Sequence, residues 1–513
     1  MHSALTNLEI ICTISSFTQC RTLPALASTC RAFEHPALNA LWRDLQSVEP
    51  LVKCLPSDLF SIDQGCVVLQ KPVDGKMWDT LFKYTTRVHS IAVTQKRCLT
   101  VVEPLSVLML SCPLTSAYLF PNLHKLTWHA EGTRIFAQIL RMALVPSMLV
   151  FHMEIISASS AFLSVLSSLG TLCPHLQNTN MYIRGETNDL SHKISPFIAQ
   201  PIAQLHHLHT LSVWDLGSQG MAHIMQLRTL QSLDLNLRTS STWDRNLLLQ
   251  LPGFHGLKWL GLSTRTIEQA SNFFNSLQVV GSSKVRVSFR SQVAVFSASA
   301  STTLFQFFTI LRERCDIVEL QYLSLIGGFG SIRTESDIFT PLHAFPNLTH
   351  LLIDGVCNIS MSDEDFCQLV RAWPKLQVLK FSSYDAFNAT TVPTFHGLIR
   401  LLQLCPALTS LSLVIDTTKV DGIDLKCPGG GLCNKHLKFL ALGDSPIKSP
   451  LNVALILSGL FPLLGQVDLL WWDIMRLRCS SSQKKPVMEP WVLVNSLLGG
   501  FSIVRERGIE VTV

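Results

Sequence analysis

The segment from Cys427 to His436 brings together side chains that could bind a metal ion. Two thiols, Cys427 and Cys433, flank a run of glycines, and the imidazole of His436 follows them closely. Zinc sites usually take their ligands from CxxC pairs, whereas this spacing is wider and no CxxC pair occurs elsewhere in the chain. We therefore expect a glycine-rich loop at this place and no bound metal.

An acidic cluster, Ser362-Asp363-Glu364-Asp365, is the second segment that could bind a cation. It directly precedes apolar residues at helical spacing, and carboxylates favour the first turn of a helix. We interpret the cluster as a helix N-terminus. The chain also lacks the GxSxG and HExxH motifs of common hydrolases and metalloproteases, so we expect no catalytic, cofactor-binding or metal-binding residues and no enzyme activity.

The composition is that of a folded chain with little net charge. Of the 513 residues, 47% are hydrophobic and 15% are charged, and the formal net charge is +5. This apolar content argues against general disorder. Because the basic residues form no long run, we expect no nucleic-acid binding. The length exceeds one ordinary globular core, which predicts several domains or one elongated repeat array.

The signals for membrane insertion and secretion are weak. The stretch 291–311 is long enough to span a bilayer, but it is rich in serine and threonine and contains Gln292 and Gln306. The first residues lack a basic region, and Glu9 interrupts the apolar segment that a signal peptide needs. The 15 cysteines form no regular framework, which favours free thiols in a reducing compartment. We expect an intracellular protein, cytoplasmic or nuclear, without membrane contact.

Three short helices are predicted in the first forty-odd residues. Thr6 can cap a helix whose third position is Glu9, Leu23-Pro24 begins a second helix, and His35-Pro36 begins a third. Each helix carries an apolar stripe. A module of this size is marginal alone because it exposes more apolar surface than it can bury, so we expect a partner.

The residues from about Leu5 to Asp44 resemble the F-box in its fungal form. The matching segments are Leu8-Glu9-Ile10-Ile11, Leu23-Pro24-Ala25-Leu26-Ala27, Thr29-Cys30-Arg31-Ala32-Phe33 and Leu41-Trp42-Arg43. One difference is that this family usually has Leu-Pro directly before the first-helix glutamate, where this chain has Asn7-Leu8. The resemblance implies docking on the Skp-type adaptor of an SCF-type cullin ubiquitin ligase. The adaptor-binding residues that it implies are Leu8, Ile10, Ile11, Ile14, Phe17, Leu23, Pro24, Leu26, Cys30, Phe33, Leu41 and Trp42.

One phrase recurs beyond residue 80: an aromatic residue or cysteine, then proline, then a strand pattern of LxxLxL type. Because proline cannot continue a helix, each copy marks the end of a helix and the start of an extended segment. Copies with proline begin at Phe120, Cys173, Phe345, Trp373, Cys405 and Phe461. Copies without proline begin at Leu208, Leu230, Leu257, Leu320 and Leu437.

The spacing of these copies indicates the fold class. Between first leucines, the copies from Leu208 to Leu257 and from Leu320 to Leu437 are separated by 22 to 32 residues, close to the roughly 20–29 residues of a leucine-rich repeat. The 63-residue gap between Leu257 and Leu320 suits two units. Val285–Phe289 and Val88–Val93 are weaker copies, and Ile509–Val513 is predicted as a closing strand. The array resembles the ribonuclease-inhibitor-like class of leucine-rich repeats. We therefore expect an α/β fold in which a three-helix F-box precedes a horseshoe-shaped solenoid, with a parallel concave sheet and helices outside.

Strand alternation predicts which side chains of the array meet a partner. The leucines of LxL point inward, so the residues between and beside them point to the concave face. Exposed aromatic residues on such a face are typical interface anchors. The client-binding residues that this predicts are Trp214, Asp234, Trp259, Tyr322, His350, Lys380 and Phe439. Other parts of the chain could instead cover some of them.

Together these patterns predict a substrate receptor with three parts. Residues 1–47 form the F-box-like adaptor-binding module, residues 48–84 a helical linker, and residues 85–513 an irregular leucine-rich-repeat domain that binds a client protein. The expected partners are a Skp-type adaptor, its cullin complex and an unidentified client. The alternative is a leucine-rich-repeat scaffold outside any ligase, in which the N-terminal helices only cap the solenoid.

Overall fold

The computed structural model describes residues 7–63, 66–94, 104, 106–108, 118–184, 188–238, 251–289, 299–327, 332–382, 391–443, 445–469 and 488–510. Two compact units divide the chain, Met1–Ser240 and Ser241–Val513. Together they contribute fourteen strands to parallel sheet, flanked by helices. This arrangement confirms the α/β class and is consistent with a leucine-rich-repeat-like solenoid.

The first unit begins with three helices, as predicted: α1 (Leu8–Phe17), α2 (Leu23–Ala27) and α3 (Arg31–Arg43). Two details differ from the prediction. The residue that caps α1 is Asn7, whose side chain accepts a hydrogen bond from the Glu9 N–H at 2.9 Å, while Thr6 lies outside the described residues. The third helix begins before His35-Pro36, so Pro36 lies inside it and is buried.

The segment predicted as a helical linker contains two helices and a hairpin. The helices are α4 (Glu49–Lys53) and α5 (Gly75–Thr85), and Asp74 caps α5 by accepting a hydrogen bond from the Met77 N–H at 2.8 Å. Between them, β2 (Phe60–Asp63) pairs antiparallel with β3 (Cys66–Leu69). Sequence reasoning missed this hairpin because it gave weight to the turn-forming residues around the strands.

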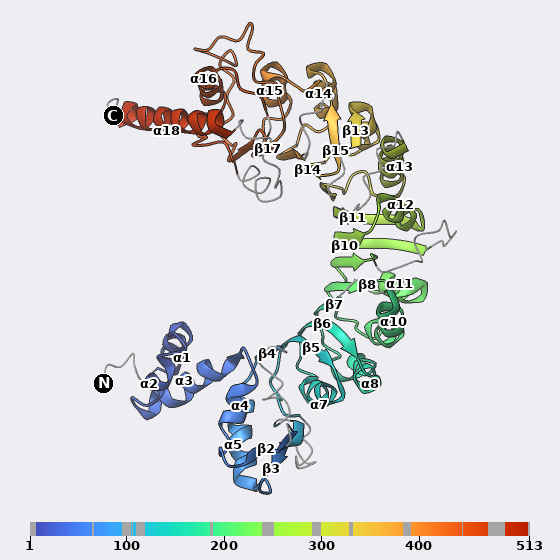
Figure 1. The fold of residues 1–513 in the computed structure, drawn as a ribbon, viewed down its shortest axis with the longest axis vertical. Coiled ribbons are helices and arrows are strands. Elements are labelled where there is room, and N and C mark those ends of the chain that lie inside the picture. The colour runs from blue at the N-terminus through green and yellow to red at the C-terminus, as the bar shows by residue number, and fades with distance from the viewer. Residues whose placement is uncertain are drawn as a thin grey trace. The chain divides into compact units, whose positions relative to one another are not determined.

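Parallel strands form the sheet of the first unit in the order β1-β4-β5-β6-β7-β8-β9. Figure 1 shows that helices α7, α8, α10 and α11 all lie on one side of these strands. The strands are β1 (Asp44–Leu45), β4 (Ser90–Thr94), β5 (Lys125–Gly132), β6 (Val150–Ala158), β7 (Asn178–Ile183), β8 (Thr210–Trp214) and β9 (Ser232–Asn236). The helices are α7 (Arg134–Ala143), α8 (Ser160–Leu166), α9 (Leu169–Leu172), α10 (Asn188–Ala203) and α11 (Gly217–Met225).

The second unit repeats this plan in the order β10-β11-β12-β14-β16-β17-β18, and its helices also lie on one side of the strands (Figure 1). Its strands are β10 (Leu251–Thr264), β11 (Leu277–Phe289), β12 (Tyr322–Ile326), β14 (His350–Asp354), β16 (Val378–Ser382), β17 (Ser410–Ser412) and β18 (Phe439–Ala441), with a separate parallel pair β13 (Ile332–Glu335) and β15 (Cys357–Ser360). Its helices are α12 (Ile267–Asn275), α13 (Ser299–Arg314), η3 (Ser336–Ala344), α14 (Asp363–Val370), α15 (Phe395–Leu404), α16 (Pro450–Leu460) and α18 (Met488–Glu510).

The recurring proline phrase has a common local structure. In the copy that begins at Trp373, the Leu376 N–H donates to the Trp373 carbonyl at 3.1 Å, which closes a turn with proline at its second position. The other five proline copies close the same turn at 3.0–3.2 Å. The residue before each of the six prolines is fully buried, at 0% exposure. The phrase therefore anchors the chain in the core, and at Cys173, Phe345, Trp373 and Cys405 it joins the end of a helix to the next strand.

Two predictions about strands differ from the structure. A seventh copy, Val145-Pro146-Ser147-Met148, was missed because methionine and phenylalanine replace the leucines, although it closes the same turn at 3.1 Å and leads into β6. The predicted closing strand at Ile509 is wrong, because Ile509 and Glu510 end helix α18. The β-branched residues there favour a strand locally, but the helix that begins at Met488 and packs on α16 continues through Ile509 and Glu510.

Candidate functional site

The apolar residues of the N-terminal helices divide into a buried and an exposed set. Ile11, Leu23, Phe33 and Trp42 are buried and form the small core of the three helices. On the opposite side of α1 lie Ile10, Ile14 and Phe17, which recur at helical spacing and are 39%, 38% and 87% exposed. Of the other predicted adaptor-binding residues, Leu8 and Pro24 are exposed, and Leu26, Cys30 and Leu41 are half-buried.

The core of these helices continues into the linker and the sheet. The ring of Trp42 stacks on Tyr84 of α5, with ring centroids 4.5 Å apart. Arg87, which precedes β4, hydrogen-bonds to the side chains of Asn39 and His35 on α3. The residues after α3 form β1, which pairs with β4. Trp42 therefore supports the module and is not a surface anchor, and the three helices are joined rigidly to the first strands.

The open face of each unit is the sheet face opposite its helices, and in the first unit it is polar. Glu154 on β6 accepts hydrogen bonds from Arg184 at 2.6 and 3.1 Å and lies 3.2 Å from the His129 ring on β5. The hydrogen bonds from Arg184 hold the pKa of the Glu154 carboxyl below its usual range. Burial, with the nearby Lys125, lowers the pKa of His152. Asp234, a predicted client-binding residue, is exposed on β9.

Trp214 differs from the prediction. Strand alternation places it on the open face of β8, but its ring is only 2% exposed. Its indole N–H donates to the Ser195 hydroxyl on α10 at 2.9 Å, and that hydroxyl donates to the Asp215 carbonyl at 3.0 Å. Because Trp214 is the last residue of its strand, where the chain turns toward the helix layer, its ring packs inward. It is therefore unavailable as a surface anchor.

The open face of the second unit carries a row of aromatic side chains. The register aligns Trp259 with Lys284 on the next strand, Lys284 with Tyr322, and Tyr322 with His350. The rings of Trp259 and Tyr322 have centroids 5.8 Å apart, and those of Tyr322 and His350 are 5.6 Å apart. All three rings are half-buried. The structure thus brings together three of the predicted client-binding residues.

Basic side chains flank this aromatic row. Lys380 on β16 lies with its Nζ 4.5 Å above the ring centre of Phe439 on β18, a cation–π contact that joins two further predicted residues. Lys284 and Arg286 are exposed on β11, in the strand that the sequence had indicated only weakly. Burial raises the pKa of Asp354 despite the neighbouring Lys380, and burial, with Lys284, lowers the pKa of His350. Three cations and one carboxylate make this face basic.

Sequence reasoning missed several residues of the two open faces. Tyr182, 49% exposed on β7, accepts a hydrogen bond from the Asn180 amide at 2.9 Å. Lys284 and Arg286 stand between the inward-pointing valines of β11. Both strands alternate in the ordinary way, so the same rule that selected Tyr322 could have selected these residues too.

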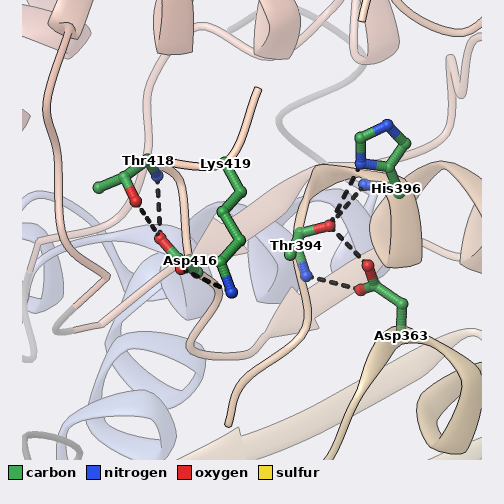
Figure 2. Close-up of polar contacts among 6 residues, drawn as sticks. All are labelled: Asp363, Thr394, His396, Asp416, Thr418 and Lys419. Carbon is green, nitrogen blue, oxygen red and sulfur yellow. Dashed lines mark hydrogen bonds and ion pairs between the residues drawn. The ribbon is translucent and has the colours of Figure 1, made fainter. Parts of the chain in front are cut away.

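The acidic cluster caps helices, as predicted. Ser362 and Asp365 form a capping box at the start of α14. The Asp363 carboxylate accepts hydrogen bonds from the Thr394 N–H at 2.7 Å and hydroxyl at 2.6 Å, and Thr394 caps α15 (Figure 2). The carboxylate of the nearby Asp416 accepts a hydrogen bond from the Thr418 hydroxyl and forms an ion pair with Lys419 (Figure 2). These carboxylates therefore fix neighbouring helices and loops.

Neither a metal cluster nor a spanning helix is found in the part of the chain that the structure describes. No group of three or more His, Cys, Asp or Glu side chains there could hold a metal ion. Gly430 and Gly431 adopt φ of 61° and 93°, which confirms the glycine-rich loop between Cys427 and Cys433. None of the described helices is long and apolar enough to cross a membrane.

Comparison with known proteins gives distant structural likeness only. No family model and no curated protein matches the sequence. Among solved structures, the chain is similar to the crystal structure of the Rad7 and Elc1 complex in yeast, with 13% sequence identity and a TM-score of 0.33. The aligned region covers 65% of this chain and 78% of that chain. A likeness at this distance adds nothing to the contacts described above.

Proposed function

We propose that this protein is a substrate receptor of an SCF-type cullin ubiquitin ligase. The N-terminal helices bind a Skp-type adaptor, and the repeat array binds a client protein inside the cell, in the cytoplasm or the nucleus. The observation that carries the proposal is the exposed stripe Ile10, Ile14 and Phe17 on a helix whose sequence resembles the first helix of an F-box. A Phe side chain that is 87% exposed on a folded module favours a partner that covers it.

The client surface in this proposal is the open face of the second unit. Trp259, Tyr322 and Phe439 supply the large apolar areas that anchor interfaces. Lys284, Arg286 and Lys380 favour a client segment that carries carboxylates, because opposite charges across an interface select the partner and speed its association.

Catalysis lies elsewhere in the proposed complex. The receptor raises the effective concentration of the client near the ligase, so that ubiquitin transfer onto the client becomes nearly intramolecular. Burial raises the pKa of both Cys173 and Cys405 to about 12, so neither of these two thiols favours the thiolate that a transfer reaction needs.

A scaffold outside any ligase is the second candidate. The stacking of Trp42 on Tyr84 and the pairing of β1 with β4 favour it, because they are what an integral cap of a solenoid requires. Affinity purification of the tagged full chain from cells separates the two candidates. Recovery of a Skp-type adaptor together with a cullin is the expected result. Recovery of other proteins with neither of these subunits would refute the ligase proposal in favour of the scaffold.

A further inference from the structure

Helix α18 has one side that is fixed to the second unit. Trp491, Val494 and Leu498 are buried against this unit, and the Trp491 indole N–H donates to the Ser445 carbonyl at 3.2 Å. The Asn495 side chain accepts from the Val467 N–H at 2.7 Å and donates to the Val467 carbonyl at 2.9 Å. These contacts fix the rotation of the helix about its axis and therefore decide which residues face away.

The side that faces away is apolar. Val492, Leu493, Ile503 and Val504 are 48%, 51%, 51% and 69% exposed, and they stand at helical spacing along more than three turns. A surface helix normally carries polar residues on this side. An apolar stripe in this place indicates a contact surface.

Two glycines in the middle of this helix give an independent indication. A Cβ added at Gly499 or Gly500 would meet nothing within 4 Å, so the packing of the chain itself does not require glycine at either position. Glycine inside a helix lowers helix stability. It also lets another backbone approach closely, as in small-residue helix contacts. Gly500 lies within the apolar stripe, where such an approach would occur.

The charges at the ends of the stripe indicate the partner. Glu489 is exposed near the start of the helix and Arg507 near its end, and both lie in line with the stripe. If a second copy of α18 packs antiparallel, with the two-fold axis between Leu497 and Gly500, Leu493 of each copy lies opposite Val504 of the other. Glu489 then lies within one residue of the position opposite Arg507 at both ends, within reach of these two long side chains. The stripe is thus complementary to itself, as a two-fold interface requires.

We propose that the exposed side of α18 forms a homodimer by antiparallel packing against α18 of a second copy of this chain. The inference is independent of the adaptor and client surfaces, which lie on other elements. It gives a ligase receptor two client-binding arrays in one assembly, which raises the avidity for a client with repeated binding segments.

Sedimentation analysis of the purified full chain at micromolar concentration tests this proposal. The expected mass is twice the 57.1 kDa of one chain. The double variant Leu493→Glu with Val504→Glu should be monomeric, with dimerisation weakened more than about a hundredfold because carboxylates would be buried without partners. The matched control, Val318→Glu with Phe305→Glu, changes residues that are 66% and 41% exposed away from α18 and should remain dimeric. A monomeric wild type, or a dimeric Leu493→Glu/Val504→Glu variant, would overturn the proposal.

Charge reversal tests the antiparallel arrangement without placing a charge in the apolar stripe. Glu489→Arg alone and Arg507→Glu alone should each weaken the dimer, because each brings like charges together at both ends. The two substitutions combined should restore the wild-type dissociation constant. If the combined variant is weaker than either single variant, the two helices do not pack in this way. Circular dichroism should show unchanged helix content in all three variants.

Discussion

The exposed stripe of α1 gives the most direct prediction: replacing Ile14 and Phe17 together by Asp should abolish adaptor binding and leave the fold intact. Phe17 is 87% exposed and contributes little to the core of the helices, whereas Ile14 is 38% exposed and has part of its side chain covered. Substitutions of exposed residues usually change the free energy of unfolding by less than about 0.5 kcal/mol, so Phe17→Asp should leave the melt unchanged. Ile14→Asp should lower the melting temperature slightly, and the variant should still unfold in one cooperative transition.

The expected loss of binding follows from the area of these side chains. A buried Phe covers roughly 150–250 Å², so covering most of the Phe17 ring at about 25 cal/mol per Å² gives at most ~5 kcal/mol. Truncating such an anchor typically costs about 2 kcal/mol or more. Two unpaired carboxylates in the contact add to this loss. We expect a total of about 4 kcal/mol, which is roughly a thousandfold in Kd.

Calorimetric titration of the purified full chain with a purified Skp-type adaptor measures this effect. Val318→Asp is a matched control, because Val318 is 66% exposed in the second unit and belongs neither to the adaptor surface nor to the client surface. Trp42→Ala is a contrasting variant that should weaken binding by disturbing the module, with a visible change in the melt. Binding of the Ile14→Asp/Phe17→Asp variant within threefold of the wild type would refute the reasoning.

The remaining predictions concern the client face, pH and the core. Trp259→Ala combined with Tyr322→Ala should weaken the free energy of client binding by about 2 kcal/mol per anchor. Less client should then be recovered in a pull-down while adaptor binding is retained, and equal recovery would place the client surface elsewhere. The pKa of Glu154 is lowered in the folded state, so its stabilisation is present above the ordinary glutamate pKa and is lost as the pH falls through the lowered value. The melting temperature of Glu154→Gln should therefore lie below that of the wild type at neutral pH and equal it in acid; a difference that persists in acid would contradict this. Trp373→Phe removes a buried hydrogen bond and should cost about 1–3 kcal/mol in denaturant unfolding; an unchanged midpoint would show that the bond contributes nothing. No cysteine, Cys405 included, should form a thiol-sensitive adduct when the chain is incubated with a ubiquitin-charged conjugating enzyme, and any such adduct would disprove the non-catalytic role.

The sequence predicts the repeat architecture well where a local physical cause acts alone. The turn in which the Leu376 N–H donates to the Trp373 carbonyl follows from the proline at its second position, and this turn ends the helix so that an extended strand can follow. The inward leucines and outward residues of β12 and β14 follow in the same way from strand alternation.

Prediction fails where a contact distant in sequence decides the outcome. Alternation places Trp214 on the open face, but a hydrogen bond to Ser195 and the turn after the strand hold it in the core. The strand predicted at Ile509 is replaced by the end of helix α18, which packs on α16. The grouping of Trp259, Tyr322 and His350 also depends on the register of four strands, β10, β11, β12 and β14, which no local pattern determines.

Neighbouring repeats of the second unit share the parallel pairing of their strands, and some junctions add a side-chain bond of their own. The Trp373 indole N–H donates to the Leu342 carbonyl at 3.2 Å, the Asp363 carboxylate accepts from the Thr394 N–H, and the Asn434 amide donates to the Leu408 carbonyl at 2.9 Å. In a consensus repeat array, each unit contacts its neighbours in the same way. Here a unit moved to another place would keep the strand pairing but lose its own side-chain bond. Exchange of units should therefore be less favourable in this array than in a consensus array.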